Sequence, residues 1–179
     1  MIETERLLLR PMRADDIDDL LHIFSDPKVM ASFGGILFER PQMERWVQRN
    51  LDHQAQYGYG LFSVIHKVDG CLIGDCGLEQ MELGEASETE LGYDFRSDYW
   101  NQGLATEAAA AVRDYAFQVL QLPRLVSLIR PGNKASQRVA EKIGMRMTAE
   151  IMRNEQPYSV YAIATEDLGT SDFFPGKHG

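Results

Sequence analysis

The stretch Tyr99-Trp100-Asn101-Gln102-Gly103-Leu104-Ala105-Thr106-Glu107 leads directly into an alanine-rich run at residues 108–116. This order predicts a short loop, made flexible by Gly103, that opens onto a long helix. The first backbone N–H groups of a helix have no intrahelical partner and lie at the positive end of the helix dipole, so each contact with an anion there is worth roughly 0.3–1 kcal/mol. The segment therefore predicts a seat for a phosphate group, with an ordinary helix N-terminus as the alternative.

Two predicted strands flank this loop and helix. Upstream, Glu90-Leu91-Gly92-Tyr93-Asp94-Phe95 has the alternating pattern of a strand. Downstream, residues 124–130 form a second strand, and Asn133-Lys134-Ala135-Ser136 opens a further helix. The chain thus runs in the order strand, loop, helix, strand, helix, with the phosphate seat between the two strands.

With these motifs the chain resembles the GNAT acetyltransferases, in particular the RimJ/RimL-like branch, which acetylates amino groups with acetyl-coenzyme A. The resemblance covers nearly the whole chain and rests on Thr4-Glu5-Arg6-Leu7-Leu8-Leu9-Arg10, Asp15-Asp16, Leu91-Gly92-Tyr93, residues 99–108 and Ser159-Val160-Tyr161. It implies an α/β (α+β) GNAT fold with a mixed, mostly antiparallel twisted sheet of about seven strands and with four helices. The sheet is expected to splay between the Glu90 and Leu125 strands, so that the coenzyme enters the gap.

Length and composition fit one domain. The chain has 179 residues, 44% of them hydrophobic, which is enough for a sizeable core. We expect the domain to span residues 1–168 and the tail, residues 169–179, to be poorly ordered. The net charge of −9 disfavours a nucleic acid as partner, because binding to its backbone needs basic patches. It suits a cationic partner better, although acidic soluble enzymes are commonplace.

The sequence carries no targeting, membrane or metal signal. It begins with a strand pattern, and no apolar run approaches about 18 residues, so we expect a cytoplasmic protein with no membrane partner, either monomeric or homodimeric. Cys71 and Cys76 fall on one predicted strand, roughly 17 Å apart at about 3.3 Å per residue, which is too far for a disulfide. No metal is expected, because the histidines lack ligand spacing. These are His22, His53, His66 and His178.

The remaining elements follow from periodicity and from helix-ending residues. Strands are predicted at residues 6–10, 61–68, 71–78, 146–153 and 158–165, and helices after Asp15-Asp16, after Pro41, and at residues 104–120 and 135–143. Asp26-Pro27 is expected to stop the first helix. Asp69-Gly70 predicts a two-residue hairpin turn, and residues 82–89 a polar, acidic turn. In the third helix a slim buried stripe, from Ala105 to Val119, is expected to lie close to the sheet.

The resemblance assigns the coenzyme site to three segments. Its coenzyme-binding residues are Leu91, Gly92, Tyr93, Gln102, Gly103, Leu104, Ala105, Thr106, Asn133 and Ser136. The backbone amides of residues 102–106 hold the diphosphate. Gln102 stands where many relatives carry Lys or Arg, so the site is expected to lack that extra positive charge. Asn133 is alternatively only the N-cap of its helix. Arg138 and Lys142 either meet the 3′-phosphate or form a solvated face.

Acetyl transfer to an amine needs a base. A protonated amine, with a pKa near 10, cannot attack a thioester until it loses its proton, and a carboxylate that takes this proton contributes about 10²–10⁴-fold. The resemblance favours Glu90, which precedes the Leu91-Gly92-Tyr93 strand segment. Glu79, Glu85 and Glu88 remain alternatives, and Glu90 is alternatively only a structural strand residue.

The leaving thiolate needs a proton donor. The usual donor of the superfamily is a tyrosine seven residues after the helix asparagine, and this chain has Ala140 there. By resemblance the Ser136 hydroxyl takes this role, with a first-turn serine that bonds to backbone as the alternative. Trp46, Phe33 and Tyr57 lie in the segment that shapes acceptor pockets in relatives, and they are alternatively core residues.

These residues predict transfer of the acetyl group from acetyl-coenzyme A to a primary amine, by direct attack. The acceptor is a protein N-terminus or a small-molecule amine. The missing tyrosine keeps a second hypothesis open, a catalytically degenerate module that only binds acetyl-coenzyme A. A nucleotide-phosphate enzyme fits less well, because the chain lacks the glycine-rich motifs of those enzymes.

Overall fold

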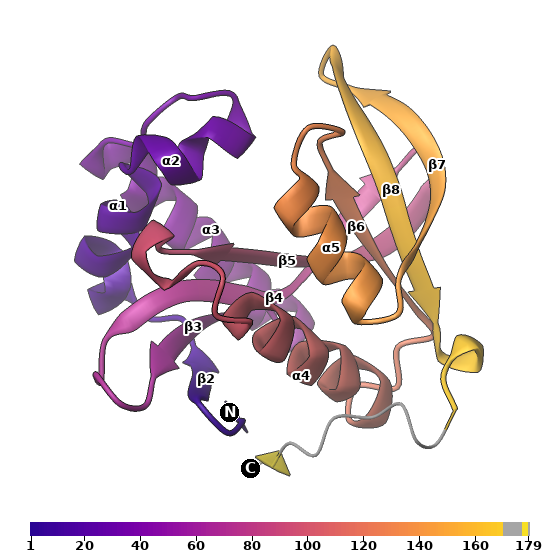
Figure 1. The fold of residues 1–179 in the computed structure, drawn as a ribbon, viewed down its shortest axis with the longest axis horizontal. Coiled ribbons are helices and arrows are strands. Elements are labelled where there is room, and N and C mark those ends of the chain that lie inside the picture. Colours follow the sequence, from indigo (N-terminus) through magenta and orange to yellow (C-terminus); the bar gives the residue numbers. More distant parts are fainter. Residues whose placement is uncertain (170–176, 179) are drawn as a thin grey trace.

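The structure, a computed structural model, describes residues 1–169 and 177–178. In these residues nine strands form one sheet in the order β7-β8-β6-β5-β4-β3-β2-β1-β9, and five α-helices pack on it (Figure 1). The strands are β1 Ile2–Glu3, β2 Leu7–Pro11, β3 Leu61–His66, β4 Leu72–Leu83, β5 Ala86–Phe95, β6 Arg124–Ile129, β7 Arg146–Arg153, β8 Gln156–Ala164 and β9 Lys177–His178. The helices are α1 Ile17–Phe24, α2 Pro27–Met30, α3 Arg40–Tyr57, α4 Leu104–Gln118 and α5 Lys134–Lys142.

The predicted splay is confirmed between β5 and β6. These two strands are the parallel neighbours of the described sheet, and their ladder holds the single pair Glu90 and Val126. Beyond that pair β6 turns away with β8, to which it pairs over six residues (Figure 1). The sheet therefore consists of two antiparallel parts that meet at Glu90 and open into a wedge.

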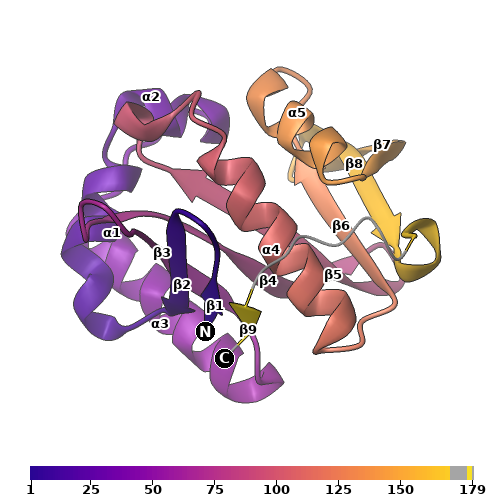
Figure 2. The same ribbon diagram turned by 60° about the horizontal axis from the view of Figure 1, so that its bottom comes forward.

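Helices cover the two faces of the larger part of the sheet (Figure 2). Helix α4 packs on one face through small residues, and Ala108, Ala109, Val112 and Ala116 are fully buried there. Helices α1 and α3 form a second apolar cluster on the other face, with Leu61 and Leu72 of the sheet. The predicted stripe is correct up to Ala116 but wrong at Val119, which is 49% exposed because α4 ends at Gln118.

The predicted acidic turn at residues 82–89 is wrong. Strand β4 continues to Leu83 and β5 begins at Ala86, so only Gly84 and Glu85 turn the chain. Apolar residues explain the longer hairpin, because Met81 packs with Val126, Val160 and Ala162 of the second part of the sheet. The acidic residues Glu82 and Glu88 occupy other positions of β4 and β5.

Other expectations need smaller corrections. Helix α2 was not expected, and it forms because Asp26 Oδ1 accepts the Lys28 N–H at 2.9 Å while Pro27 takes the first helical position. The hairpin turn after β3 has four residues, 67–70, since the His66 N–H bonds the Cys71 carbonyl at 2.9 Å. The short strands β1 and β9 pair with each other and raise the strand number above seven.

Three predictions concern the C-terminal tail, the two cysteines and membrane spans. Residues 170–176 and 179 of the predicted tail lie outside the described residues, so the expectation about its order concerns a segment of which only 169 and 177–178 are described. Cys71 and Cys76 are free thiols, as expected. In the described part of the chain, no helix has the length and apolar character that a bilayer span needs.

Candidate active site

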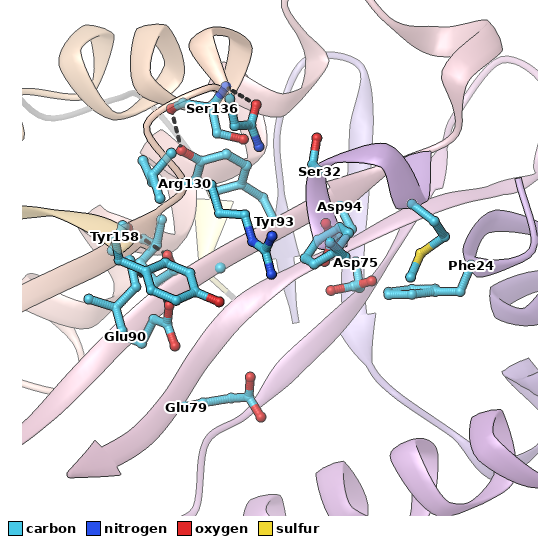
Figure 3. A pocket seen from close by; sticks show the side chains of 18 of the residues that line it. Phe24, Ser32, Asp75, Glu79, Glu90, Tyr93, Asp94, Arg130, Ser136 and Tyr158 are labelled. Carbon is cyan, nitrogen blue, oxygen red and sulfur yellow. Dashed lines mark hydrogen bonds between the residues drawn. The ribbon is translucent and has the colours of Figure 1, made fainter. Parts of the chain in front are cut away.

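A cavity of about 590 Å³ opens where β5 and β6 diverge (Figure 3). Its walls come from α1, α3, β3 to β8, the start of α5 and the segment of residues 30–38. Four carboxylates line it, those of Asp75, Glu79, Glu90 and Asp94. Aromatic side chains line it too, those of Phe24, Phe33, Phe38, Trp46, Tyr93 and Tyr158. The splay thus creates an acidic and aromatic pocket at the centre of the sheet.

Glu90 lies at the apex of this pocket. Its Oε1 accepts the Leu128 N–H at 3.3 Å, across the point where the two strands separate. Burial raises the pKa of Glu90 to about 7, and the nearby Glu79 carboxylate adds to the shift. A carboxyl group with this pKa exchanges a proton readily near neutral pH, which is the property required of a general base.

The other candidate bases are placed less favourably. Glu79 lies opposite Glu90 on β4 and lines the cavity, but Arg49 approaches its Oε1 at 3.5 Å. Glu88 is outside the cavity lining and pairs with Arg124 at 3.3 Å. Glu85 is exposed in the turn between β4 and β5. Glu90 and Glu79 are therefore the two of these four carboxylates that line the cavity.

Ser136 and Asn133 line the same cavity from the start of α5. Asn133 is the N-cap, because its Oδ1 accepts the Ser136 N–H at 3.1 Å. The Tyr93 hydroxyl of β5 donates to the Ser136 carbonyl at 2.8 Å and so bridges the splay. Ala140 is fully buried, and the phenol that reaches α5 comes instead from Tyr93.

The predicted coenzyme residues divide into two groups. Leu91, Gly92 and Tyr93 line the cavity with Asn133 and Ser136. Residues 102–106 do not line it and form the N-terminus of α4, with Gly103 as the N-cap at a φ of 78°. This left-handed conformation favours glycine. The Glu107 N–H bonds the Gly103 carbonyl at 3.0 Å, so the helix begins there as predicted.

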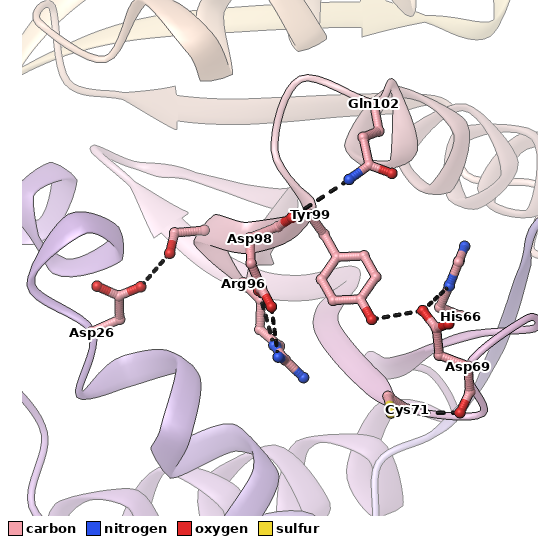
Figure 4. Close-up of polar contacts among 9 residues, drawn as sticks. Asp26, His66, Asp69, Cys71, Arg96, Asp98, Tyr99 and Gln102 are labelled. Atoms are coloured by element: carbon pink, nitrogen blue, oxygen red, sulfur yellow. Dashed lines mark hydrogen bonds and ion pairs between the residues drawn. The ribbon is translucent and has the colours of Figure 1, made fainter.

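Side-chain contacts brace the segment that leads into this helix (Figure 4). The Tyr99 hydroxyl donates to Asp69 Oδ2 at 2.7 Å, and His66 Nδ1 lies 2.6 Å from the same oxygen. Arg96 pairs with Asp98 at 2.7 Å, and the Asp98 carbonyl accepts from Gln102 Nε2 at 3.4 Å. These contacts hold the loop on both of its sides.

Sequence reasoning missed Arg6. Its Nη1 donates to the Gln102 carbonyl at 2.7 Å, and its Nε donates to Glu107 Oε2 at 2.7 Å. A guanidinium paired with Glu107 therefore lies beside the loop, although residue 102 itself carries no charge. Arg6 belongs to the quoted N-terminal motif, but nothing in the sequence relates it to a loop about one hundred residues away.

Three further predictions concern side chains near the pocket. Trp46 and Phe33 line it, whereas Tyr57 stacks on His53 with ring centroids 4.6 Å apart. Arg138 and Lys142 are exposed on α5 and do not line the cavity. In the described part of the chain, no three His, Cys, Asp or Glu residues are grouped as metal ligands.

Comparison with known proteins places this architecture. Residues 6–146 match the model of the acetyltransferase (GNAT) domain. The chain is 38% identical to the uncharacterized protein YkkB of Bacillus subtilis (strain 168), over 88% of this chain and 92% of that protein. It superposes on an acetyltransferase of Agrobacterium tumefaciens strain C58 with a TM-score of 0.79 and 31% identity, covering 91% and 93% of the two chains.

A more distant structure has the same fold. RimJ of Mycobacterium smegmatis, solved in complex with CoA-disulfide, superposes with a TM-score of 0.77 at 22% identity, covering 93% of this chain and 85% of that one. The domain match over most of the chain and the similarity to YkkB show that this chain belongs to the GNAT acetyltransferase family.

Proposed function

We propose that this chain transfers the acetyl group of acetyl-coenzyme A to a primary amine by direct attack. One observation carries the proposal. Glu90, a half-buried residue whose carboxyl group has a pKa of about 7, lies at the apex of the splay and lines the cavity. A general base at this position serves a reaction whose nucleophile must first lose a proton, as an ammonium group must.

The residues fit acetyl-coenzyme A as the donor. The N-terminus of α4 begins at Gly103 and carries the Arg6 guanidinium beside it, so it suits the diphosphate. The part of the cavity lined by Tyr93, Asn133 and Ser136 leaves space for the pantetheine arm. RimJ of Mycobacterium smegmatis, a protein of the same fold, was solved in complex with CoA-disulfide, which supports this choice of donor.

The chemistry uses two residues of this chain. Glu90 accepts the proton of the bound ammonium group, directly or through water, and the free amine forms a C–N bond to the acetyl carbonyl. The C–S bond breaks, the Ser136 hydroxyl delivers a proton to the leaving sulfur, and the Ser136 oxygen takes up the second proton of the attacking nitrogen, so that the hydroxyl is restored. Asn133 and Tyr93 hold the Ser136 backbone in place from two sides.

Loss of the usual tyrosine supports one competing function. With Ala140 buried in its place, the chain is alternatively a module that binds acetyl-coenzyme A without turnover. The two functions differ in thiol release. The proposed enzyme releases free coenzyme A when amines of several classes are supplied, including peptides with a free N-terminus. A binding module retains measurable affinity for acetyl-coenzyme A and releases no thiol above the hydrolysis rate with any of them.

A further inference from the structure

Two pairs of carboxylates face one another across β4 and β5. Asp75 lies opposite Asp94, and Glu79 lies opposite Glu90, in the antiparallel register of the two strands. All four side chains line the same cavity (Figure 3). Like charges placed directly opposite on one face of a sheet are destabilising, so two such pairs in one pocket call for an explanation.

The two pairs are separated by Gly77 and Gly92, which lie opposite each other; the backbone of Gly60 and Leu61 covers Gly77, whereas Gly92 is open. Gly92 lies between Glu90 and Asp94, and open space surrounds the position of its absent Cβ. Four residues along a strand span about 13 Å at about 3.3 Å per residue. An extended aliphatic chain fits over this stretch.

Asp75 is the most unusual member of the cluster. Its side chain is 1% exposed, and its Oδ2 accepts no hydrogen bond from any described residue. Burial raises the pKa of Asp75 well above its ordinary value, and burial with nearby Glu79 raises that of Asp94 to about 7. An unpaired buried carboxyl group is costly unless a partner of opposite charge arrives. Glu90 has a role in the proposed reaction, whereas Asp75 has none.

The surrounding walls also suit a cation. Phe24 stacks against Phe38 and Trp46, with ring centroids 5.3 and 5.1 Å apart, and all three line the cavity. Aromatic faces stabilise ammonium groups and pack against methylene chains. Positive charge also lines the cavity, but on the other part of the sheet. The residues there are Arg130 and Arg153, and the Arg130 guanidinium lies 5.7 Å from the centroid of the Tyr158 ring.

From this arrangement we infer that the acceptor is a small amine with two cationic nitrogens. The reacting nitrogen lies at the Glu79 and Glu90 pair, the second nitrogen lies at the Asp75 and Asp94 pair, and the carbon chain crosses Gly92. The inference rests on the proposed function and names its substrate class. A zwitterionic acceptor, with its carboxylate at Arg130, is the competing occupant.

The test compares acceptors that differ only at their far end. Thiol release from acetyl-coenzyme A is measured with unbranched diamines from propanediamine to hexanediamine, with monoamines of equal chain length, and with amino acids that carry a carboxylate in place of the second amine. The wild-type enzyme is expected to favour at least one diamine over its matched monoamine by about tenfold or more in kcat/KM, because a second ion pair forms in a dry site.

Asp75→Asn tests the second nitrogen site, and Glu82→Gln is the matched control. Asn keeps the shape of the side chain and removes its charge, while Glu82 is an exposed residue of the same strand outside the cavity. Asp75→Asn is expected to remove the diamine preference and Glu82→Gln to keep it. Thermal unfolding of both variants checks that they are folded.

The outcomes separate the two proposals. Equal use of diamines and monoamines, a preference for amino acids, or a full diamine preference in folded Asp75→Asn overturns the two-cation acceptor and leaves the acetyltransferase standing. If no amine releases thiol, the proposed function fails, and calorimetry of hexanediamine with the coenzyme A-loaded protein decides the rest. Binding that Asp75→Asn abolishes then supports the cation site, and absence of binding overturns it.

Discussion

The Glu90 carboxylate accepts the Leu128 backbone N–H at 3.3 Å, across the point where β5 and β6 separate. This contact joins the two parts of the sheet at the place where the cavity begins. It also puts the most suitable base of the molecule at the apex of the wedge. The proposed function requires a base at this position and a coenzyme site beside it.

The first prediction concerns the loop before α4. Gly103→Val is expected to weaken coenzyme A binding by about tenfold or more, because a β-branched residue is strained at a φ of 78° and crowds the diphosphate. Gly84→Val is the control, since Gly84 has a φ of 64° in the β4–β5 turn, away from the loop. Calorimetry measures both. Equal coenzyme affinity in the two folded variants would remove the diphosphate from this loop.

The second prediction concerns Glu107, which holds Arg6 beside the loop. Burial alone would raise the pKa of Glu107, but hydrogen bonds from Thr4 and Arg6 outweigh it and keep this pKa below its ordinary value. The folded pKa is therefore lower than the unfolded one of about 4.3. The stabilisation by the ionised carboxylate is complete above that unfolded pKa and is lost as the pH falls through the folded pKa.

Glu107→Gln tests this linkage. The variant is expected to lose about 1–3 kcal/mol of stability at neutral pH, because a neutral amide replaces a charged acceptor in a buried network. The difference in Tm between wild type and variant should shrink as the pH falls below about 4. A difference that stays constant between pH values of about 7 and 3 would contradict the ionised state of Glu107.

The third prediction separates positioning from proton transfer at α5. Ser136→Ala is expected to lower kcat by about tenfold or more while the Kd for coenzyme A stays within about twofold, because the backbone contacts of Ser136 remain. Ser87→Ala, at an exposed position of β5, is the control. Wild-type turnover in Ser136→Ala, when chemistry limits the rate, would leave Ser136 as a helix residue only.

Local pattern was enough to predict most of the elements. Capping residues, turn glycines and hydrophobic period placed α1, α3, α4 and α5, and the family resemblance placed the splay beside Glu90. The exceptions share a cause. Residues 82–89 look like an acidic turn on their own, and all of them except Gly84 and Glu85 are strand because Met81 packs against apolar partners in β6 and β8. Such partners are invisible in a local window.

The site residues show the same division. Gly103 and Asn133 could be predicted because helix ends favour these residue types, and that preference is local. Arg6 reaches the loop only through the tertiary fold. The pairing of Asp75 with Asp94 depends on the register of β4 against β5, which the sequence leaves open when the connecting turn is misassigned.

The pH profile of kcat/KM in wild type and Glu90→Gln tests whether Glu90 is the general base. Gln keeps the shape of the side chain but accepts no proton, so the variant is expected to lose roughly 10²-fold or more at neutral pH. It should recover partly at high pH, where free amine is abundant. The wild-type profile should rise through a pKa of about 7 that the variant lacks.

Glu85→Gln, at the exposed β4–β5 turn, is the control and should keep the wild-type profile. Only Glu90→Gln is expected to lose the rise of kcat/KM near pH 7. Full activity of folded Glu90→Gln at neutral pH, with that limb unchanged, would contradict it and move the base to Glu79 or to bound water.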